Sequence, residues 1–296
     1  MDLELLLDVG AELAEAPIWD AAAASLIWVD QLAGTVNRVG LDGVAGPTLA
    51  LGGRVGCALP RSDGGLVLTT EAGFARVDED GTFALIAEVG ANATASFLND
   101  GKCDALGRFW AGSVGLAADG KVAPATGALH RLDADGSVST QLRGLTLANG
   151  MDWSPDGRTF YLIDSFSGGI DAFEFDLARG LLGPPRRALE LGVELARGFA
   201  DGMCVDADGC LWTAVWGAGE VRRYTPEGAL ECTLPLPVSQ PTSCVFAGDQ
   251  LDVLVITSAW HRLTAQERAA QPHAGGIFAT RPGVSGLPTH SFASNR

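Results

Sequence analysis

The sequence has little basic charge and no long apolar run. Its 296 residues include 20 Lys and Arg against 36 Asp and Glu, a formal net charge of −16. Such an acidic surface repels phosphate backbones and anionic headgroups, so we expect neither nucleic acid nor a membrane as a partner. No apolar segment approaches the roughly 20 residues of a membrane-spanning helix. Residues 1–10 carry Asp and Glu where a secretory signal begins with basic residues. These absences predict a cytoplasmic protein, a monomer or weak homo-oligomer, that acts on a small molecule.

Several motifs of common enzymes and metal sites are also missing. The six cysteines form no Cys-x-x-Cys pair and lie mostly in apolar segments, so we expect reduced, buried thiols and no zinc or disulfide framework. There is no Gly-x-Ser-x-Gly elbow, no glycine-rich phosphate loop and no dinucleotide fingerprint. A serine nucleophile and a nucleotide cofactor are therefore not favoured. With 47% hydrophobic residues, the chain is nevertheless expected to fold.

What the sequence does contain is a repeat. A polar turn rich in Asp and Gly, followed by a short run of β-forming residues that ends in small residues or Asp, occurs six times. Alignment of the copies gives steps of 40, 42, 51, 51 and 42 residues, each about the length of one four-stranded propeller blade. The aligned residues are Trp28, Leu68, Trp110, Tyr161, Trp212 and Leu254. Further hairpins between the copies, such as 129–137 and 221–228, supply the remaining strands.

The repeat predicts an all-β fold, a six-bladed β-propeller with four antiparallel strands per blade, formed by residues 1–296 as a single domain. A pair of β-sandwiches is the alternative, but a sandwich has no reason to repeat one turn and strand at near-constant spacing. Only 264–271 has a helical pattern, and we expect it to be an insertion before a late strand at 275–279.

Four polar residues occupy nearly the same place in four repeats. Glu15, Asn99, Asn149 and Asp201 lie 13, 11, 12 and 11 residues ahead of the aligned positions. The innermost strands of a propeller line its central channel, so equivalent residues just before these strands are expected to meet at one mouth. Carboxylate and amide oxygens suit a hard divalent cation such as calcium, magnesium or manganese. Asn-Gly and Asp-Gly pairs are also ordinary turn formers, but Glu15 is in no such pair. The shared position of these four residues in their repeats therefore predicts a metal site at the centre of the propeller.

Five ordered stretches resemble the gluconolactonase, senescence marker protein (regucalcin) and luciferin-regenerating enzyme family. They are 14–20, 99–113, 148–157, 199–217 and 240–259. The resemblance implies a six-bladed propeller that hydrolyses sugar lactones with one divalent metal. It implies Glu15, Asn149 and Asp201 as the metal ligands, with Asn99 beside them at the substrate. Calcium is the expected cation, and magnesium, manganese, zinc and iron are alternatives.

Two departures from the family pattern concern the substrate. Sugar-lactone members carry an arginine two residues before Asn-Asp-Gly, where this chain has Phe97, and an acidic residue in the segment that here reads Val114-Gly115-Leu116-Ala117. Without the guanidinium and the carboxylate, hydrogen bonds to sugar hydroxyls are lost. A less polar lactone or a related cyclic ester is then favoured, unless nearby groups compensate.

The remaining candidate residues concern the base and the pocket walls. Asp201 is the candidate general base, and Asp100 takes this role if Asp201 is committed to the metal. Trp216, expected after the fifth inner strand, and His261, expected at the end of the sixth, join Phe97 as candidate substrate contacts, although packing between blades and an ordinary surface loop are the alternatives. The predicted function is a metal-dependent lactonase. The alternative is a metal-binding propeller that does not hydrolyse, or that catalyses another step on a specialised metabolite.

Overall fold

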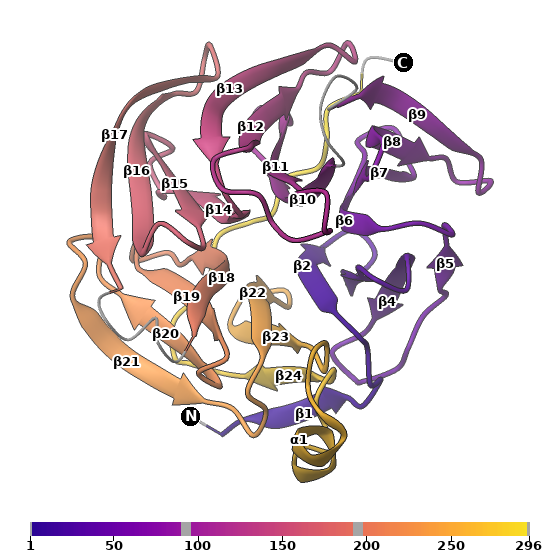
Figure 1. Ribbon diagram of the computed structural model, residues 1–296, viewed down its shortest axis with the longest axis vertical. Coiled ribbons are helices and arrows are strands. Elements are labelled where there is room, and N and C mark those ends of the chain that lie inside the picture. Colours follow the sequence, from indigo (N-terminus) through magenta and orange to yellow (C-terminus); the bar gives the residue numbers. More distant parts are fainter. Residues whose placement is uncertain (1, 90–95, 192–197, 295–296) are drawn as a thin grey trace.

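Six antiparallel sheets of four strands each surround a central axis in the computed structural model, which describes residues 2–89, 96–191 and 198–294 (Figure 1). The predicted six-bladed β-propeller is therefore confirmed. In the first five blades the strands follow chain order outwards from the axis. No helix in the described part of the chain has the length and hydrophobicity needed to cross a membrane.

The strands of the first three blades are as follows. Blade 1 contains β2 (Ala14–Asp20), β3 (Ser25–Asp30), β4 (Thr35–Val39) and β5 (Leu49–Ala50). Blade 2 contains β6 (Val55–Pro60), β7 (Leu66–Thr70), β8 (Gly73–Val77) and β9 (Phe83–Glu88). Blade 3 contains β10 (Ser96–Cys103), β11 (Phe109–Gly115), β12 (Gly127–Leu132) and β13 (Val138–Leu145).

The last three blades complete the ring. Blade 4 contains β14 (Ala148–Trp153), β15 (Thr159–Asp164), β16 (Gly169–Asp176) and β17 (Leu181–Glu190). Blade 5 contains β18 (Phe199–Val205), β19 (Leu211–Trp216), β20 (Glu220–Tyr224) and β21 (Leu230–Pro235). Blade 6 contains β22 (Pro241–Ala247), β23 (Val253–Ser258), β24 (Ile277–Thr280) and, from the start of the chain, β1 (Glu4–Leu7).

The two ends of the chain close the ring and one end of its channel. Strand β1 pairs with β24, Glu4 opposite Ala279, and so completes blade 6 (Figure 1). Residues 285–293 then run across the ends of the inner strands and hydrogen-bond to the backbones of blades 5, 6, 1, 2 and 3. The inner strands finish at this end of the channel. The tail therefore covers the end opposite to the one at which the inner strands begin.

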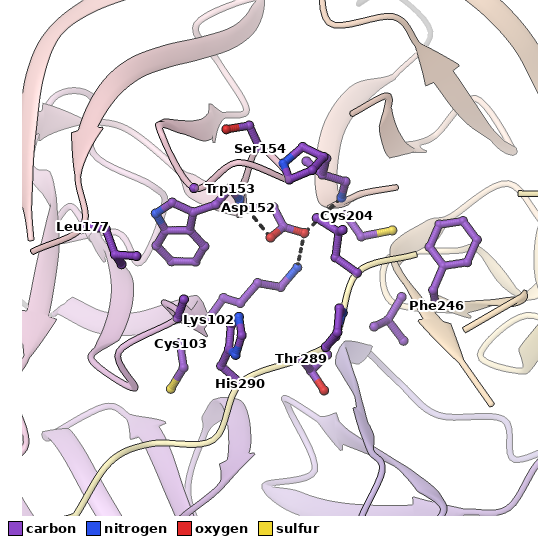
Figure 2. Close-up of a pocket in the computed structure, with 17 residues that line it drawn as sticks. Lys102, Cys103, Asp152, Trp153, Ser154, Leu177, Cys204, Phe246, Thr289 and His290 are labelled. Carbon is purple, nitrogen blue, oxygen red and sulfur yellow. Dashed lines mark hydrogen bonds and ion pairs between the residues drawn. The ribbon is translucent and has the colours of Figure 1, made fainter. Parts of the chain in front are cut away.

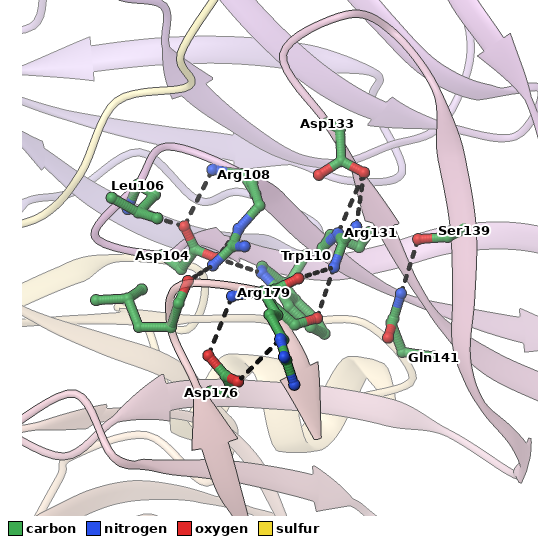
Figure 3. A network of polar contacts seen from close by, with 12 residues as sticks. Asp104, Leu106, Arg108, Trp110, Arg131, Asp133, Ser139, Gln141, Asp176 and Arg179 are labelled. Atoms are coloured by element: carbon green, nitrogen blue, oxygen red, sulfur yellow. Dashed lines mark hydrogen bonds and ion pairs between the residues drawn. The ribbon is translucent and has the colours of Figure 1, made fainter. Parts of the chain in front are cut away.

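The sequence repeat has a hydrogen-bonding reason. In blade 3, the fully buried Asp104 accepts from Nε1 of Trp110 at 2.9 Å and from Nε of Arg108 at 2.7 Å (Figure 3). In blade 5, Asp206 accepts from Nε1 of Trp212 at 2.9 Å. The turn aspartate thus holds an indole six residues later, which joins the turn to the second strand.

The aligned aromatic positions themselves lie in the second strand of each blade, not in the innermost one. The expectation that Trp216 follows an inner strand and that His261 ends one is therefore wrong. Trp216 ends β19 and His261 follows β23, whereas the inner strands of these blades are β18 and β22. The error arises because the repeat motif begins at the turn after the first strand.

The remaining elements agree with the sequence. Helix α1 (Ala265–Ala270) begins after Thr264, whose hydroxyl and Glu267 form a capping box, and none of its residues is buried. All six cysteines are free, and only Cys232 is partly exposed. The core lies between adjacent blades, for example where Trp110 of blade 3 meets Trp153 and Phe160 of blade 4.

Candidate functional site

The four residues predicted by register lie on the channel, each in the innermost strand of its blade. Glu15 is in β2, Asn99 in β10, Asn149 in β14 and Asp201 in β18. They are inside these strands, not just before them as expected. In each strand the pairing with the second strand is interrupted at or directly beside the predicted residue. Such bulges re-aim side chains next to active sites, and the spacing of the repeats carries no sign of them.

The Asn-Gly and Asp-Gly pairs serve close packing here, because they lie within strands and form no turn. A Cβ atom on Gly150 would stand 2.5 Å from the backbone nitrogen of Met203 and 2.8 Å from the carbonyl oxygen of Asp201. A Cβ on Gly202 would likewise collide with Ser243 of the next blade. Glycine at these positions lets adjacent inner strands approach one another, which brings Asn149 towards Asp201.

Hydrogen bonds fix the two asparagines against each other. Nδ2 of Asn99 donates to Oδ1 of Asn149 at 2.7 Å and to the carbonyl oxygen of Ala148 at 3.0 Å. Gln31 donates to Oδ1 of Asn99 at 2.9 Å, and Asn149 donates to the hydroxyl of Ser165 at 2.8 Å. The Oδ1 atom of Asn149 therefore lies on the same side of the channel as the amide of Asn99.

Gln31 and Ser165 were not predicted, although a signal for them exists. Each directly follows an aspartate that ends the second strand of its blade, Asp30 in β3 and Asp164 in β15. Both aspartates end copies of the repeat, so the residues after them occupy equivalent places beside the inner strands. The four predicted residues lie ahead of the aligned positions, whereas Gln31 and Ser165 follow them, so the register of the four does not identify these two.

These aspartates also position the predicted ligands. Asp30 accepts hydrogen bonds from the backbone N–H groups of Glu12 and Leu13, and Asp164 accepts from those of Thr146 and Leu147. In both blades the second of these residues lies two positions before a predicted metal ligand, Glu15 or Asn149. The same side-chain-to-backbone contact thus fixes the chain where it enters β2 and β14.

The carboxylates on the channel disfavour one another's charged forms. Burial, followed by the charges of Asp201 and Asp100, raises the pKa of Glu15 well above its ordinary value. Burial and the charge of Asp100 raise the pKa of Asp201 in the same way. For Asp100 burial raises the pKa to about 6, against the opposing effects of the Gly101 N–H and Lys102. Three acidic groups therefore share a desolvated space where ionisation is costly.

The donor set fits a divalent cation. Glu15 and Asp201 are 9% and 4% exposed, and within the described ranges no Lys or Arg forms an ion pair with either. Asp201 accepts no hydrogen bond from any described residue, and Glu15 accepts only that of the Ala16 N–H, at 3.4 Å. No three His, Cys, Asp or Glu side chains of the described chain gather as a metal cluster. The predicted donors, two carboxylates and the Asn149 amide, are hard oxygen ligands of the kind that suits calcium or magnesium.

The other candidates lie in different surroundings. Trp216 stacks on Phe199, two residues before Asp201, with ring centroids 6.1 Å apart. The Phe97 ring, two residues before Asn99, lies under the guanidinium of Arg54. His261 instead contacts Glu12 at 3.3 Å, and no contact joins it to the predicted ligands within the described residues. Trp216 and Phe97 therefore flank the channel mouth, whereas His261 has a carboxylate partner of its own.

A cavity of about 300 Å³ lies at the other end of the channel (Figure 2). Lys102, Asp152 and Cys204 line it, each three residues further along an inner strand than Asn99, Asn149 and Asp201, and tail residues 287–290 cover it. Nζ of Lys102 donates to Asp152 at 2.7 Å. Burial opposes the charged lysine, but Asp152 outweighs it and the pKa of Lys102 is raised. None of the predicted site residues lines this cavity.

Comparisons with known proteins agree with this architecture. The family model for the SMP-30/gluconolactonase/LRE-like region matches residues 13–260. Regucalcin from Danio rerio is 36% identical over 293 residues, which cover 98% of both chains. The structure of a luciferin-regenerating enzyme superposes with a TM-score of 0.88 at 27% identity over 97% of each chain. That of a calcium-binding protein, regucalcin, from Agrobacterium tumefaciens gives 0.90 at 25% identity, covering 97% of this chain and 96% of the other.

Proposed function

This chain belongs to the SMP-30/gluconolactonase/LRE-like family, and on that basis we propose that it is a divalent-metal-dependent hydrolase that opens lactones or related cyclic esters. The observation that carries the proposal is that Glu15 and Asp201 are buried on the channel, where the charge of Asp100 raises the pKa of both, while no cationic side chain of the described residues pairs with either. Asn149 and Asn99 lie on neighbouring inner strands and are hydrogen-bonded to each other. Calcium is the proposed cation, because these donors are all oxygens and a related regucalcin is described as calcium-binding.

Each residue then has a role. Glu15, Asn149 and Asp201 hold the cation, which when bound supplies Lewis acidity for an ester carbonyl and lowers the pKa of a water. Asn99 orients the substrate, because Gln31 and Asn149 hold its amide in one position. Asp100 receives the proton of the attacking water if Asp201 is committed to the metal. Burial raises the pKa of Asp100 to about 6 in the metal-free protein, so this carboxylate is a stronger base there than an ordinary aspartate.

The walls of the mouth support a substrate less polar than a sugar lactone. Phe97 is buried under the guanidinium of Arg54 and Trp216 stacks on Phe199, so aromatic side chains lie near both Asn99 and Asp201 along the chain. Ala117 lies in the loop after β11, where an acidic contact was expected in sugar-lactone enzymes. A ring with apolar faces is desolvated more favourably against these side chains than a polyol is.

A lactone panel tests the proposal. The purified protein is treated with chelator, reloaded with calcium, magnesium, manganese or zinc, and assayed for acid release with a pH indicator on sugar, aliphatic and aromatic lactones. We expect activity on at least one lactone that the chelator abolishes and one metal restores. Stoichiometric metal binding with no acid release on the whole panel would instead favour the second candidate, a metal-binding propeller that does not hydrolyse or that catalyses another step. The aromatic side chains of Phe97 and Trp216 near the mouth are the observation that supports this second candidate function.

A further inference from the structure

Arg54 lies beside the predicted substrate contact, although it belongs to a different blade. It directly precedes β6, at the same end of the channel where the inner strands begin. Its Nη1 donates to Oε1 of Gln31 at 2.6 Å, and Gln31 in turn donates to Asn99. A single buried amide therefore joins the guanidinium to Asn99.

The guanidinium also stacks on the aromatic wall. Its central carbon lies 4.2 Å from the centroid of the Phe97 ring, the geometry of a cation–π contact. Phe97 and Asn99 are two residues apart on β10, and the pairing of this strand with β11 is interrupted directly after Leu98, beside Asn99. Phe97 stands where a strand-borne guanidinium was expected in sugar-lactone enzymes, and Arg54 supplies one from the neighbouring blade.

Most of the hydrogen-bonding capacity of Arg54 remains available. A guanidinium has five N–H donors, and the contact with Gln31 is the hydrogen bond that Arg54 makes to described residues. The carboxylate whose charge acts on Arg54 is that of Glu71, but no carboxylate of the described residues lies within 4.0 Å of the guanidinium. Arg54 is half-buried, and this burial lowers its pKa. A partly desolvated guanidinium without a carboxylate partner binds anions well.

We propose that Arg54 is the specificity-determining residue of this site and that it selects lactones whose ring carries a carboxylate or another anionic group. The inference rests on the proposed hydrolytic function and names its substrate class. The ring of such a substrate lies at the channel mouth beside Asn99, and its anionic substituent accepts hydrogen bonds from N–H groups of Arg54 that no described residue occupies.

Two matched probes test this assignment, dihydrocoumarin and a dihydrocoumarin with a carboxylate on its aromatic ring. Both are assayed with the metal-loaded native protein and with Arg54→Gln, Arg54→Lys and the control Arg179→Gln, a change of an exposed arginine in the turn between β16 and β17. We expect Arg54→Gln to lower kcat/KM for the carboxylated probe roughly 30-fold, mainly through KM, as expected for one lost charge-assisted contact. For the neutral probe we expect a loss about 10-fold smaller than for the carboxylated one, because Arg54→Gln also removes the contact with Gln31, which holds Asn99. Arg54→Lys keeps the positive charge but loses the planar guanidinium with its paired N–H donors. We expect this variant to retain part of the preference for the carboxylated probe.

Equal losses on both probes, or no loss on either, would overturn the assignment. If the native protein hydrolyses neither probe, binding of the ring-opened carboxylated product is measured by isothermal titration calorimetry. Binding that is at least roughly 10-fold weaker in Arg54→Gln then supports the anion site while the hydrolytic function fails. Binding that Arg54→Gln leaves unchanged, or no binding by the native protein, overturns the proposal. Thermal melts show that each variant is folded.

Discussion

Glu15 and Asp201 are buried acids without a basic partner among the described residues, which is an unusual situation for structural carboxylates. Burial and mutual repulsion both act against their charged forms, so this arrangement lowers the stability of the metal-free fold at neutral pH. Residues that serve packing alone would be more stable as neutral side chains. Their presence is explained if they bind a cation.

The first prediction concerns these ligands. Glu15→Gln and Asp201→Ala should each weaken calcium binding by roughly 100-fold or more, because a charged ligand is removed from a site with few donors. Affinity is measured by equilibrium dialysis. Glu12→Gln is the matched control, since this carboxylate lies three residues earlier, is 39% exposed and contacts His261.

The variant Asp201→Asn distinguishes a role of Asp201 as a metal ligand from a role as the general base. A variant that keeps its calcium but loses acid release would favour the base role of Asp201, whereas loss of both would leave Asp100 as the base. If Glu15→Gln, Asp201→Ala and Glu12→Gln all bound calcium as the native protein does, the predicted ligand set would be wrong.

The second prediction concerns pH and His130. Burial, followed by the charge of Arg143, lowers the pKa of this imidazole to about 4. The unfolded chain takes up its proton near pH 6.5 while the folded protein does not, so stability is complete above that pH and falls as the pH drops towards 4. The loss reaches about 3 kcal/mol for a shift of this size.

Urea unfolding of native protein and His130→Gln at pH 7.5 and pH 4 measures this effect. The stability of the variant should fall less than that of the native protein across this interval, because Gln cannot take up a proton. Parallel losses in the two proteins would show that His130 does not contribute.

At the scale of elements, the entry of the chain into each inner strand decides where the ligands stand. Asp164 and Asp30 hold the backbone immediately before β14 and β2, and bulges then re-aim the side chains. The side-chain contact and the bulge act together, because a ligand on a regular strand would alternate with its neighbours between two faces. The local geometry of strands β2 and β14 therefore contributes directly to the site.

The third prediction tests this positioning. Asp164→Ala leaves the N–H groups of Thr146 and Leu147 without their acceptor, at a cost of about 1–3 kcal/mol. Calcium affinity should also fall, because Asn149 loses its fixed entry point. Asp156→Ala is the control, as Asp156 holds an exposed turn at the other end of the same blade. Reduced stability with native calcium affinity would show that Asp164 supports the fold alone.

At the scale of the whole molecule, the site depends on the ring being closed. Its proposed ligands come from blades 1, 4 and 5, and blade 6 lies between blades 5 and 1. Blade 6 is complete only when β1 pairs with β24. Residues at the two ends of the chain therefore hold the channel together.

The fourth prediction is that deletion of residues 2–8, which removes β1, lowers the free energy of unfolding by roughly 3 kcal/mol or more, since the edge of β24 and the apolar side chains beneath β1 become exposed. Calcium affinity should fall with it. Glu4→Ala, which keeps the backbone pairing, is the control. Chemical denaturation and equilibrium dialysis measure the two effects, and native-like stability of the deletion would contradict the closure by β1.

The number of blades and the four channel residues follow from the sequence alone. A turn and strand that recur every 40–51 residues predict similar units, and in blades 3 and 5 the aspartate of the turn bonds an indole six residues later. Equivalent positions in a ring of similar blades lie close to the axis of the ring. Glu15, Asn99, Asn149 and Asp201 are therefore predicted from the sequence without the structure.

Only the tertiary structure decided which groups act on those four residues. Gln31, Ser165 and Arg54 reach the site from other strands and loops, and His261 turns to Glu12 instead. The bulges at the predicted ligands, and the position of the Arg54 guanidinium over the Phe97 ring, also depend on how neighbouring blades pack. Contacts between blades are set by three-dimensional packing across many residues, and a local pattern along one strand does not specify them.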